Sequence, residues 1–599
     1  MTNGLAAIDN KLEKMKIGEN SHQEYKWSNE IKERILQFSF QLTENGGENI
    51  NELNNLKLEY SSIIEYCLSE KRNNYLLILY KLIAQTRDII NGKGIYSLSY
   101  MMIGVWANIG ENNEKYKELG HKLAGLAIEN CITESNGNHP LGSWKDIKYF
   151  LNYFKNEYNL DENTIENHPV FLHLLNIVIN QLKKDETSLN PSLLARWIPR
   201  EKSNKFGWIS PLLAYKFFDN YIITAKTDNQ LYAAQNKALM HFRKIITNIN
   251  KKLRTVQVNQ CARDWKSINF DKNLTSITLR KQSIAFQDRD KKGNKRIHND
   301  EFDMEDRNEC SKNYEKYIMD CHEGKKIIKS KNISIIDLVR DAIKLKNYEY
   351  NELEKMALNL QWDEQCKSTP NLENMIAMVD TSGSMECDNF KPLYTAIGLG
   401  LRVAEKSKFG KRILTFSQNP EWINLEDCKD FIDSVNKIRK STWGMNTNFY
   451  SACDLILKTA IENDIEPNEL KNTTLVIFSD MQIDEGNNTN DSQNSLFDAI
   501  KEKYSNAGKK SKYKIPYPVP HIIFWNLRTT SGFPSLSSRP NTSMISGSSS
   551  NLLNLFLDKG SNILEEITPW KLLEDSLNNS RYLEFQTAFS INYIYNITY

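Results

Sequence analysis

The stretch Met375 to Ser384 (MIAMVDTSGS) constrains the fold of this chain more than any other. The apolar run Met375–Val379 predicts a buried strand of a parallel sheet, because such strands are covered on both faces and read as continuously hydrophobic. Asp380, Ser382 and Ser384 follow directly, at the carboxyl end of the strand. Open α/β sheets place their ligand sites at that end. We therefore expect a divalent cation there.

Length and charge limit the classes of function. The 599 residues are enough for more than one hydrophobic core. The 77 basic and 75 acidic residues nearly cancel, so no overall charge attracts nucleic acid or a membrane, although local basic patches remain open to both. The nine cysteines form no CxxC pair, which is typical of a reducing compartment. Without an apolar signal core or an uncharged apolar run of about 18 residues, we expect a soluble, cytoplasmic protein with no membrane contact.

Beyond Asp380 the sequence alternates between strand and helix patterns, which predicts a mostly parallel sheet wrapped on both faces. The predicted strands after the first are Arg412–Phe416, Trp422–Leu425, Thr474–Ser479, His521–Trp525 and Thr542–Ser546. The predicted helices are 392–408, Phe431–Ile438, Phe449–Ile461, Ser495–Tyr504 and one that begins at Leu552.

The preceding half carries apolar residues at helical spacing in one segment after another. The segments are Tyr75–Ile90, Leu98–Ile109, Tyr116–Cys131, Trp144–Tyr158, Val170–Leu182, Pro211–Ile223 and Leu231–Leu253. Short polar connections between such helices suggest an α-solenoid or HEAT-like helical-repeat region, although the sequence has no strict period. The expected fold class is therefore an all-α helical-repeat region followed by a doubly wound, Rossmann-like α/β domain.

Changes in composition suggest six consecutive regions. We expect a polar amino-terminal extension at 1–51, the helical-repeat domain at 52–285, a densely charged and flexible insertion at 286–332, connecting helices at 333–370, the α/β domain at 371–560 and a helical tail at 561–599. The apolar content of the tail predicts that it packs on a domain.

Two later loops carry oxygen ligands in the order of a known metal site. GMNTN occupies Gly444 to Asn448, and FSD occupies Phe478 to Asp480. With DTSGS at Asp380 to Ser384, they resemble the von Willebrand factor type A (vWA) domain, whose metal-ion-dependent adhesion site (MIDAS) combines a DxSxS loop, a threonine and a later aspartate. The resemblance implies that a partner carboxylate completes the shell of Mg²⁺ or Mn²⁺, which prefer oxygen ligands. The implied site residues are Asp380, Ser382, Ser384, Thr447 and Asp480, with the hydroxyls as direct ligands and the carboxylates acting partly through water.

Each of these motifs also has a purely structural explanation. An aspartate followed by serine after a strand is commonly a helix cap, and Thr447 can cap the helix that starts near Phe449. Asp480 can simply begin a turn. Some domains of this fold keep the loops and lose the metal, so a structural adaptor with an unoccupied site remains an alternative.

The helical half also resembles proteins with a vWA domain at their carboxyl end. The stretches that carry this resemblance are TRDIINGKGIYSLSY at Thr86 to Tyr100, GSWKDI at Gly142 to Ile147, RWIPREKSNKFGW at Arg196 to Trp208, and FRKIITNINKKLRTVQ with CARDWKSINF ending at Phe270. They resemble an uncharacterised family whose architecture is similar to that of the Ro ribonucleoprotein (TROVE-like) proteins. That architecture implies RNA as one candidate partner. The candidate contacts are Lys145, Arg196, Arg200, Lys202, Lys205, Arg243, Lys251 and Arg254, although Lys and Arg on a helix are usually only solvated.

These observations predict a binding scaffold rather than an enzyme. The cation is expected to dock a protein carboxylate while the helical half binds a macromolecule, with structured or single-stranded RNA as a candidate. The alternative is a Mg²⁺-dependent phosphohydrolase with Asp380 as nucleophile. The haloacid-dehalogenase pattern requires a second aspartate at the position of Ser382, and no GxxxxGK[ST], HExxH or GxSxG element is present.

Overall fold

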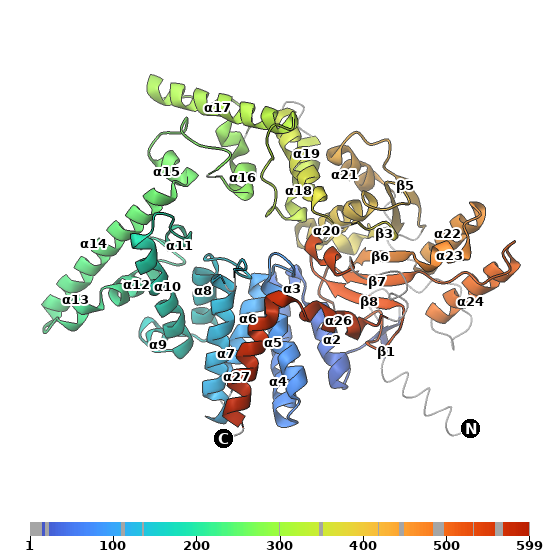
Figure 1. Cartoon of the computed structure of the whole chain (residues 1–599), viewed down its shortest axis with the longest axis horizontal. Coiled ribbons are helices and arrows are strands. Elements are labelled where there is room, and N and C mark those ends of the chain that lie inside the picture. The colour runs from blue at the N-terminus through green and yellow to red at the C-terminus, as the bar shows by residue number, and fades with distance from the viewer. Residues whose placement is uncertain are drawn as a thin grey trace. The chain divides into compact units, whose positions relative to one another are not determined.

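The computed structural model groups the chain into two compact units. It describes residues 15–17, 23–109, 114–134, 137–272, 274–290, 292–298, 300–346, 352–369, 371–416, 419–441, 449–482, 496–530, 532–556 and 567–597 (Figure 1). The sheet unit comprises residues 1–85, 91–95 and 330–579, and the helical unit comprises 86–90, 96–329 and 580–599. This grouping differs from the six consecutive regions expected above. The amino-terminal residues belong to the unit that contains 330–579, and the carboxyl-terminal residues belong to the unit that contains 96–329.

The sheet unit is built on six strands in the order β5-β4-β3-β6-β7-β8. Every neighbouring pair is parallel except β4 with β5, so the predicted mostly parallel sheet is confirmed. The chain order reverses between β3 and β6, which makes that boundary the switch point of a doubly wound sheet. The strands are β3 (Met375–Asp380), β4 (Arg412–Phe416), β5 (Trp422–Asn424), β6 (Thr474–Ser479), β7 (His521–Asn526) and β8 (Thr542–Ser546), and a separate hairpin pairs β1 (Met15–Ile17) with β2 (Gln23–Tyr25).

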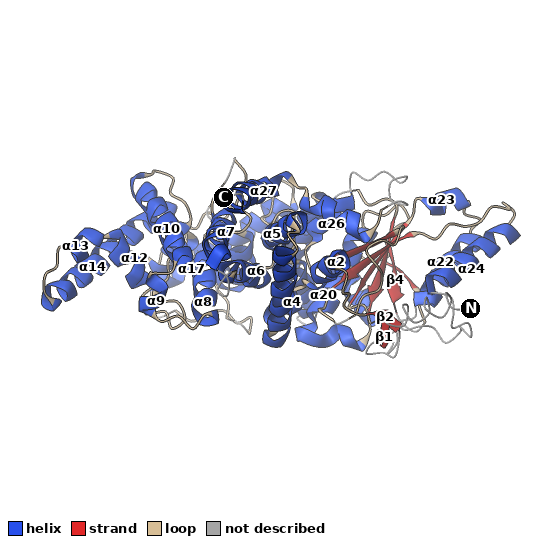
Figure 2. Cartoon of the chain, turned by 90° about the horizontal axis from the view of Figure 1, so that it is seen from below, coloured by secondary structure: helices blue, strands red, loops and turns tan. Residues whose placement is uncertain are grey.

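Helices cover both faces of the sheet, with α20 on one side and α22 and α24 on the other (Figure 2). Alternate strand residues such as Val379 and Phe478 enter one core with α18, α20 and α21. Phe524 of β7 faces the opposite side, where its ring lies 6.2 Å from that of Phe449. The covering helices are α18 (Ile335–Lys346), α19 (Glu352–Lys367), α20 (Cys387–Ala404), α21 (Phe431–Lys440), α22 (Phe449–Glu462), α23 (Pro467–Lys471) and α24 (Leu496–Lys510).

Two glycines let α20 lie close to the strand that carries the candidate site. A Cβ at Gly400 would lie 2.4 Å from Val379 Cγ2, and one at Gly398 would lie 2.5 Å from Ile335 Cγ1. Any side chain there would push α20 away from β3 and α18. The position of the strand end therefore depends on these two residues.

The amino-terminal segment is part of the sheet unit and not a polar extension. It contributes α2 (Ile31–Gln41), α3 (Glu44–Glu48) and α4 (Ile50–Ser69), and α2 packs against β8, α4 and α26. Its polar residues are buried because they bond to the loop after β7. Gln41 Oε1 accepts a hydrogen bond from Thr530 N (2.7 Å), and Phe40 O accepts one from Asn526 Nδ2 (2.9 Å). The expectation for 1–51 failed because polar composition was read as exposure.

The remaining elements of the sheet unit follow α4 and β8. They are α5 (Asn73–Arg87), which ends in the helical unit, η2 (Ser550–Phe556) and α26 (Pro569–Leu577).

The helical unit confirms a helical region in the amino-terminal half of the chain. Within it α7 packs against α6, α10 and α27. In α14, Phe242 and Ile249 lie on the buried face of the helix. The helices are α6 (Tyr96–Asn108), α7 (Glu114–Ile132), α8 (Asp146–Glu157), α9 (Glu162–Glu166), α10 (Pro169–Thr187), α11 (Leu194–Trp197), α12 (Ile209–Phe217), α13 (Asp219–Ile223), α14 (Asp228–Leu253), α15 (Val256–Cys261), α16 (Ser276–Phe286), α17 (Glu301–His322) and α27 (Leu583–Ile597), with η3 (Ser580–Tyr582).

The charged segment expected to be a flexible insertion contains a long, packed helix. In α17, Cys310, Tyr314, Tyr317 and Cys321 are buried, at spacings of four, three and four residues. Asp306 accepts hydrogen bonds from the backbone N–H groups of Trp265 (2.8 Å) and Lys266 (3.0 Å). The expectation was wrong for this segment because its apolar stripe consists mostly of tyrosine and cysteine, with Ile318 as the aliphatic residue among them. In the part of the chain that the structure describes, no helix has the length and apolarity needed to cross a membrane.

A buried lysine joins the amino-terminal segment to the edge strand β8. Lys93 Nζ donates hydrogen bonds to Ser39 O (2.8 Å), Leu42 O (3.1 Å) and Ser546 Oγ (2.6 Å). All three acceptors are neutral. Burial lowers the pKa of Lys93 to about 7.

We predict that Lys93 makes the sheet unit more stable as the pH rises from about 7 toward 10. The pKa of Lys93 is lower in the folded than in the unfolded chain, so the unfolded chain binds more protons in this window and stability increases with pH. The free energy of unfolding of the natural chain minus that of Lys93→Met should rise by up to about 1.4 kcal/mol per pH unit. Urea unfolding at several pH values measures this difference. A difference that is independent of pH would contradict the assignment.

Candidate functional site

The two aspartates of the predicted cation site lie at the switch point of the sheet. Strands β3 and β6 are parallel neighbours in which Val379 pairs with Phe478. Asp380 is the last residue of β3, and Asp480 follows the last residue of β6. Both aspartates are fully buried, with no exposed side-chain surface. The structure therefore brings together two acids that are 100 residues apart in the chain.

Hydrogen bonds fix both oxygens of Asp380. Oδ1 accepts from Ser382 N at 2.8 Å, and Oδ2 accepts from Ser479 Oγ at 2.5 Å. Burial and the charge of Asp480 together raise the pKa of Asp380 to about 7, against the effect of these bonds. Ser479 was not named by the sequence analysis, although it stands in the FSD motif that supplied Asp480.

The two predicted hydroxyl ligands lie side by side in the loop after β3. Ser382 Oγ and Ser384 Oγ are 3.0 Å apart, and Ser382 is buried. Two oxygens in neighbouring positions of an octahedral Mg²⁺ shell are separated by about 3.0 Å, because each bond is about 2.1 Å long. Thr447, the third predicted hydroxyl ligand, lies outside the described residues.

An arginine that the sequence analysis missed reaches Asp480. Arg528 Nη2 lies 3.1 Å from Asp480 Oδ2. Arg528 follows β7, and its backbone N–H donates to Asn526 Oδ1 at 3.1 Å. Only the order of the strands shows that the end of β7 lies beside the end of β6, so no local signal in the sequence identifies this residue.

One further acid interacts with this arginine, and a neighbouring acid repels that carboxylate. Burial raises the pKa of Glu52, in the first turn of α4; Asp388 raises it further, whereas Arg528 lowers it. Asp388 itself is exposed, as expected for a loop acid. Arg528, Asp388 and Asp480 also influence the thiol of Cys387, whose pKa burial raises to about 11. Arg528 therefore interacts with Asp480 and Glu52, and Asp388 repels the carboxylate of Glu52.

Asp388 begins a strained turn. Asp388, Asn389 and Phe390 adopt left-handed backbone conformations with φ of 51°, 58° and 64°. Each such residue other than glycine costs about 1–2 kcal/mol. Lys391, the next residue, forms an ion pair with Glu48 of α3. This ion pair and the packing of α20 hold the turn beside the candidate site.

The donor set fits a hard divalent cation. Two buried carboxylates and two adjacent hydroxyls are oxygen ligands, which Mg²⁺ and Mn²⁺ prefer. Asp480 Oδ2 is buried and accepts no hydrogen bond in the described part of the chain. Its interaction with Arg528 is therefore one of opposite charges. A buried carboxylate of this kind is a natural ligand or water acceptor for a cation.

A separate group of cations lies over aromatic rings in the helical unit. We call it the cation–aromatic cluster, and it consists of Lys145, Lys148, Arg196 and Lys205 with Tyr96, Tyr149, Trp197 and Phe206. Lys148 Nζ lies 5.0 Å from the ring centre of Trp197 and 5.4 Å from that of Phe206, and Lys145 Nζ lies 4.9 Å from that of Tyr149. None of the four cations forms an ion pair with a carboxylate among the described residues.

The cluster is electrostatically unfavourable without an anion. Burial lowers the pKa of Lys148, and Lys145 lowers it further. Burial also lowers the pKa of Lys145, with Arg87 and Lys281 acting in the same direction and Asp146 opposing them. Asp146 is engaged by Arg87, whose Nη2 lies 2.6 Å from Asp146 Oδ2. The acid nearest the cluster is therefore already paired.

The other predicted RNA contacts have different environments. Arg243 pairs with Glu201 at 2.8 Å. Arg200 and Lys202 are exposed in the loop that ends at Lys205. Lys251 and Arg254 lie at the end of α14, which is about 12 Å or more along the helix from Arg243. The structure thus brings Lys145, Arg196 and Lys205 together, and adds Lys148, which lies one helical turn after Lys145 and was missed.

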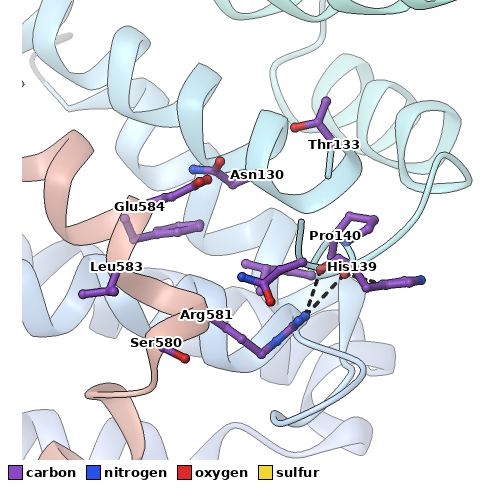
Figure 3. Close-up of a pocket in the computed structure, with 11 residues that line it drawn as sticks. Asn130, Thr133, His139, Pro140, Ser580, Arg581, Leu583 and Glu584 are labelled. Carbon is purple, nitrogen blue, oxygen red and sulfur yellow. Dashed lines mark hydrogen bonds between the residues drawn. The ribbon is translucent and has the colours of Figure 1, made fainter. Parts of the chain in front are cut away.

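The helical unit also contains a small hollow beside the start of α27 (Figure 3). Its volume is about 170 Å³. Arg581 lines it, but its guanidinium is paired with Asp88 through Nε and Nη2, both at 2.9 Å, and also donates to His139 O at 3.2 Å. Burial raises the pKa of Glu584, another lining residue. Because the arginine is already paired, we regard this hollow as structural.

We predict opposite effects of Asp380→Asn with and without a divalent cation. In EDTA at about pH 8, the substitution should raise the free energy of unfolding by about 1–3 kcal/mol, because it removes one of two buried like charges. With saturating Mg²⁺, the natural chain should gain stability and the variant should not. Thermal and urea unfolding measure both effects.

The control for this prediction is Asp427→Asn. Asp427 is an exposed acid that pairs with Lys437 at 2.6 Å, and its loss should change stability by less than about 0.5 kcal/mol in either buffer. Destabilisation by Asp380→Asn in EDTA together with an equal response to Mg²⁺ would contradict the prediction.

Comparison with known proteins gives a match for the carboxyl-terminal part and one for most of the chain. Residues 374–585 match a family model described as a domain of unknown function (DUF7788), which begins one residue before β3. The chain is 26% identical over 533 residues to the uncharacterized protein L728 of Acanthamoeba polyphaga mimivirus, and the similarity covers 86% of this chain and 81% of that protein. Both matches include the strands that carry Asp380 and Asp480.

Proposed function

We propose that this protein is a binding scaffold whose sheet unit docks a partner carboxylate through a divalent cation, Mg²⁺ or Mn²⁺. The observation that carries the proposal is the 3.0 Å separation of Ser382 Oγ and Ser384 Oγ beside two fully buried aspartates at the switch point. These residues are the ones that the resemblance to the vWA domain and its MIDAS implies. When bound, the cation supplies an open coordination position for an oxygen of the partner.

The residues of the chain have distinct roles in this proposal. Ser382 and Ser384 supply hydroxyl oxygens, and the bond from Ser382 N to Asp380 Oδ1 fixes the loop that carries them. Asp380 and Asp480 supply the negative charge that attracts the cation. Ser479 holds the second oxygen of Asp380 and thereby sets the orientation of that carboxylate. Thr447 is proposed as a further ligand from the sequence pattern alone.

Docking is favoured over catalysis by the surroundings of Asp380. A nucleophilic aspartate needs an oxygen that can reach a substrate, whereas both oxygens of Asp380 accept hydrogen bonds and the side chain is fully buried. The phosphohydrolase alternative would be supported if the chain hydrolysed a phosphoester and Asp380→Asn abolished this activity. If the protein is an adaptor with an unoccupied site, Mg²⁺ should not change its free energy of unfolding.

We predict that partners bound through this site dissociate on chelation. Immobilised full chain in Mg²⁺ should retain proteins from a cell extract that EDTA elutes, because the cation joins the oxygens of the site to a carboxylate of the partner. The double variant Ser382→Ala, Ser384→Ala should retain less than a tenth as much. Quantitative mass spectrometry of the eluates measures the difference.

The matched control removes two hydroxyls elsewhere in the same unit. Ser441 and Ser511 bond to carbonyls at helix ends, at 2.6 Å and 2.7 Å, and their joint replacement by alanine should leave the retained set unchanged. Retention that survives EDTA, or full retention by the Ser382 and Ser384 double variant, would refute the cation-bridged mode.

We also propose single-stranded RNA as the partner of the helical unit. The observation that favours it is the cation–aromatic cluster, in which cations without carboxylate partners lie beside exposed or half-buried rings such as Tyr96 and Phe206. Phosphates pair with such cations, and bases stack on such rings. This proposal agrees with the resemblance to the Ro-like architecture.

We predict that Lys145→Ala combined with Lys148→Ala weakens the binding of a fluorescent oligouridine at least about tenfold. Loss of two phosphate contacts should also reduce the slope of log K against log salt by about 1–2. Filter binding at several salt concentrations measures both quantities. The control is Lys312→Ala with Lys325→Ala, two exposed lysines that pair with neighbouring acids. Binding that is micromolar or weaker and independent of salt would exclude the RNA proposal.

A further inference from the structure

The strand-end site contains a positive charge of its own. Arg528 Nη2 lies 3.1 Å from Asp480 Oδ2, and the side chain of Arg528 is 18% exposed while that of Asp480 is fully buried. A guanidinium at this distance neutralises much of the charge that would attract a divalent cation to Asp480. The guanidinium of Arg528 and a divalent cation would therefore compete for the carboxylate of Asp480.

The chain holds Arg528 in place through the loop after β7. Thr529 Oγ1 donates to Gln41 O at 3.0 Å and lies 2.7 Å from Thr43 Oγ1, and Thr530 N donates to Gln41 Oε1 at 2.7 Å. These bonds tie the loop to the connection between α2 and α3. The backbone of Arg528 is thus anchored, and its side chain is the part that can change partner.

A second acid, Glu52, also interacts electrostatically with this guanidinium. Glu52 and Asp388 both interact with Arg528 or with the groups beside it, and they repel each other. Glu52 Oε2 is buried and makes no hydrogen bond in the described part of the chain. A displaced guanidinium would give this oxygen the hydrogen bond that it lacks.

We propose that Arg528 is an internal competitor for the divalent cation, which pairs with Asp480 when the site is empty and with Glu52 and Asp388 when a cation is bound. This inference rests on the proposed cation-dependent docking. Arg528 limits the affinity for the cation, because binding must first break the pair with Asp480. It also couples occupancy of the site to the first turn of α4, where Glu52 lies.

The test is the affinity of the full chain for Mn²⁺, measured by titration calorimetry and by electron paramagnetic resonance of the free ion. Arg528→Gln should bind Mn²⁺ at least tenfold more tightly than the natural chain. Glu52→Gln should weaken binding about threefold in the natural background and have no effect in the Arg528→Gln background, because Glu52 acts through the arginine.

The matched control is Arg412→Gln. Arg412 pairs with Glu426 at 3.0 Å at the start of β4, which is the opposite end of the sheet, and its loss should not change the affinity for Mn²⁺. Because Arg528→Gln leaves Asp480 without its partner, circular dichroism must show that the variant is folded. Hydrogen exchange of the natural chain needs no variant, and Mg²⁺ should change the exchange of residues 49–53 and 526–530 together.

The outcomes separate the inference from the proposed function. Binding by the natural chain with equal or weaker binding by Arg528→Gln, or an unchanged exchange of residues 49–53, overturns the inference and leaves cation-dependent docking intact. Binding by Arg528→Gln but not by the natural chain supports the inference and overturns docking in the natural protein. Absence of binding by every variant overturns both.

Discussion

The central constraint on the sheet unit is that two carboxylates are buried at the adjacent ends of β3 and β6. Asp380 and Asp480 have no exposed surface, and like charges in such a position are costly unless a positive charge accompanies them. The doubly wound order of the strands creates this position, because β3 and β6 are neighbours whose connections leave in opposite directions. The hydroxyls of Ser382 and Ser384 then offer oxygens on the same side. These oxygens carry the proposal that the site binds a cation.

The amino-terminal segment holds the loop that brings a positive charge to these carboxylates. Residues of α2 and α3 bond to the loop after β7, and that loop carries Arg528 to Asp480. The buried lysine Lys93 fastens the same segment to β8 through three neutral acceptors. Helix α2, which begins at Ile31, therefore packs at the carboxyl end of a sheet whose first strand begins at Met375.

The sequence alone was sufficient for the strands and for the acids at their ends, because continuous apolar runs identify buried parallel strands and their carboxyl ends share one edge. Arg528 and Glu52 could not be identified from the sequence. The contact of Arg528 with Asp480 depends on strand order, and the interaction of Glu52 with Arg528 depends on the fold of a distant segment. Composition misled in two places. Polar residues of α2 such as Gln41 are buried by hydrogen bonds to a loop, and the stripe of α17 uses residues such as Tyr314, which the search for aliphatic residues overlooked.

The most direct test of a cation site at the switch point is an anomalous-difference map from crystals of the full chain grown with Mn²⁺. The account predicts a single peak between Asp380 and Asp480, about 2.1–2.2 Å from Ser382 Oγ and Ser384 Oγ, with the guanidinium of Arg528 moved away from Asp480. A map without a peak there, with Arg528 still paired with Asp480 at saturating Mn²⁺, would contradict it.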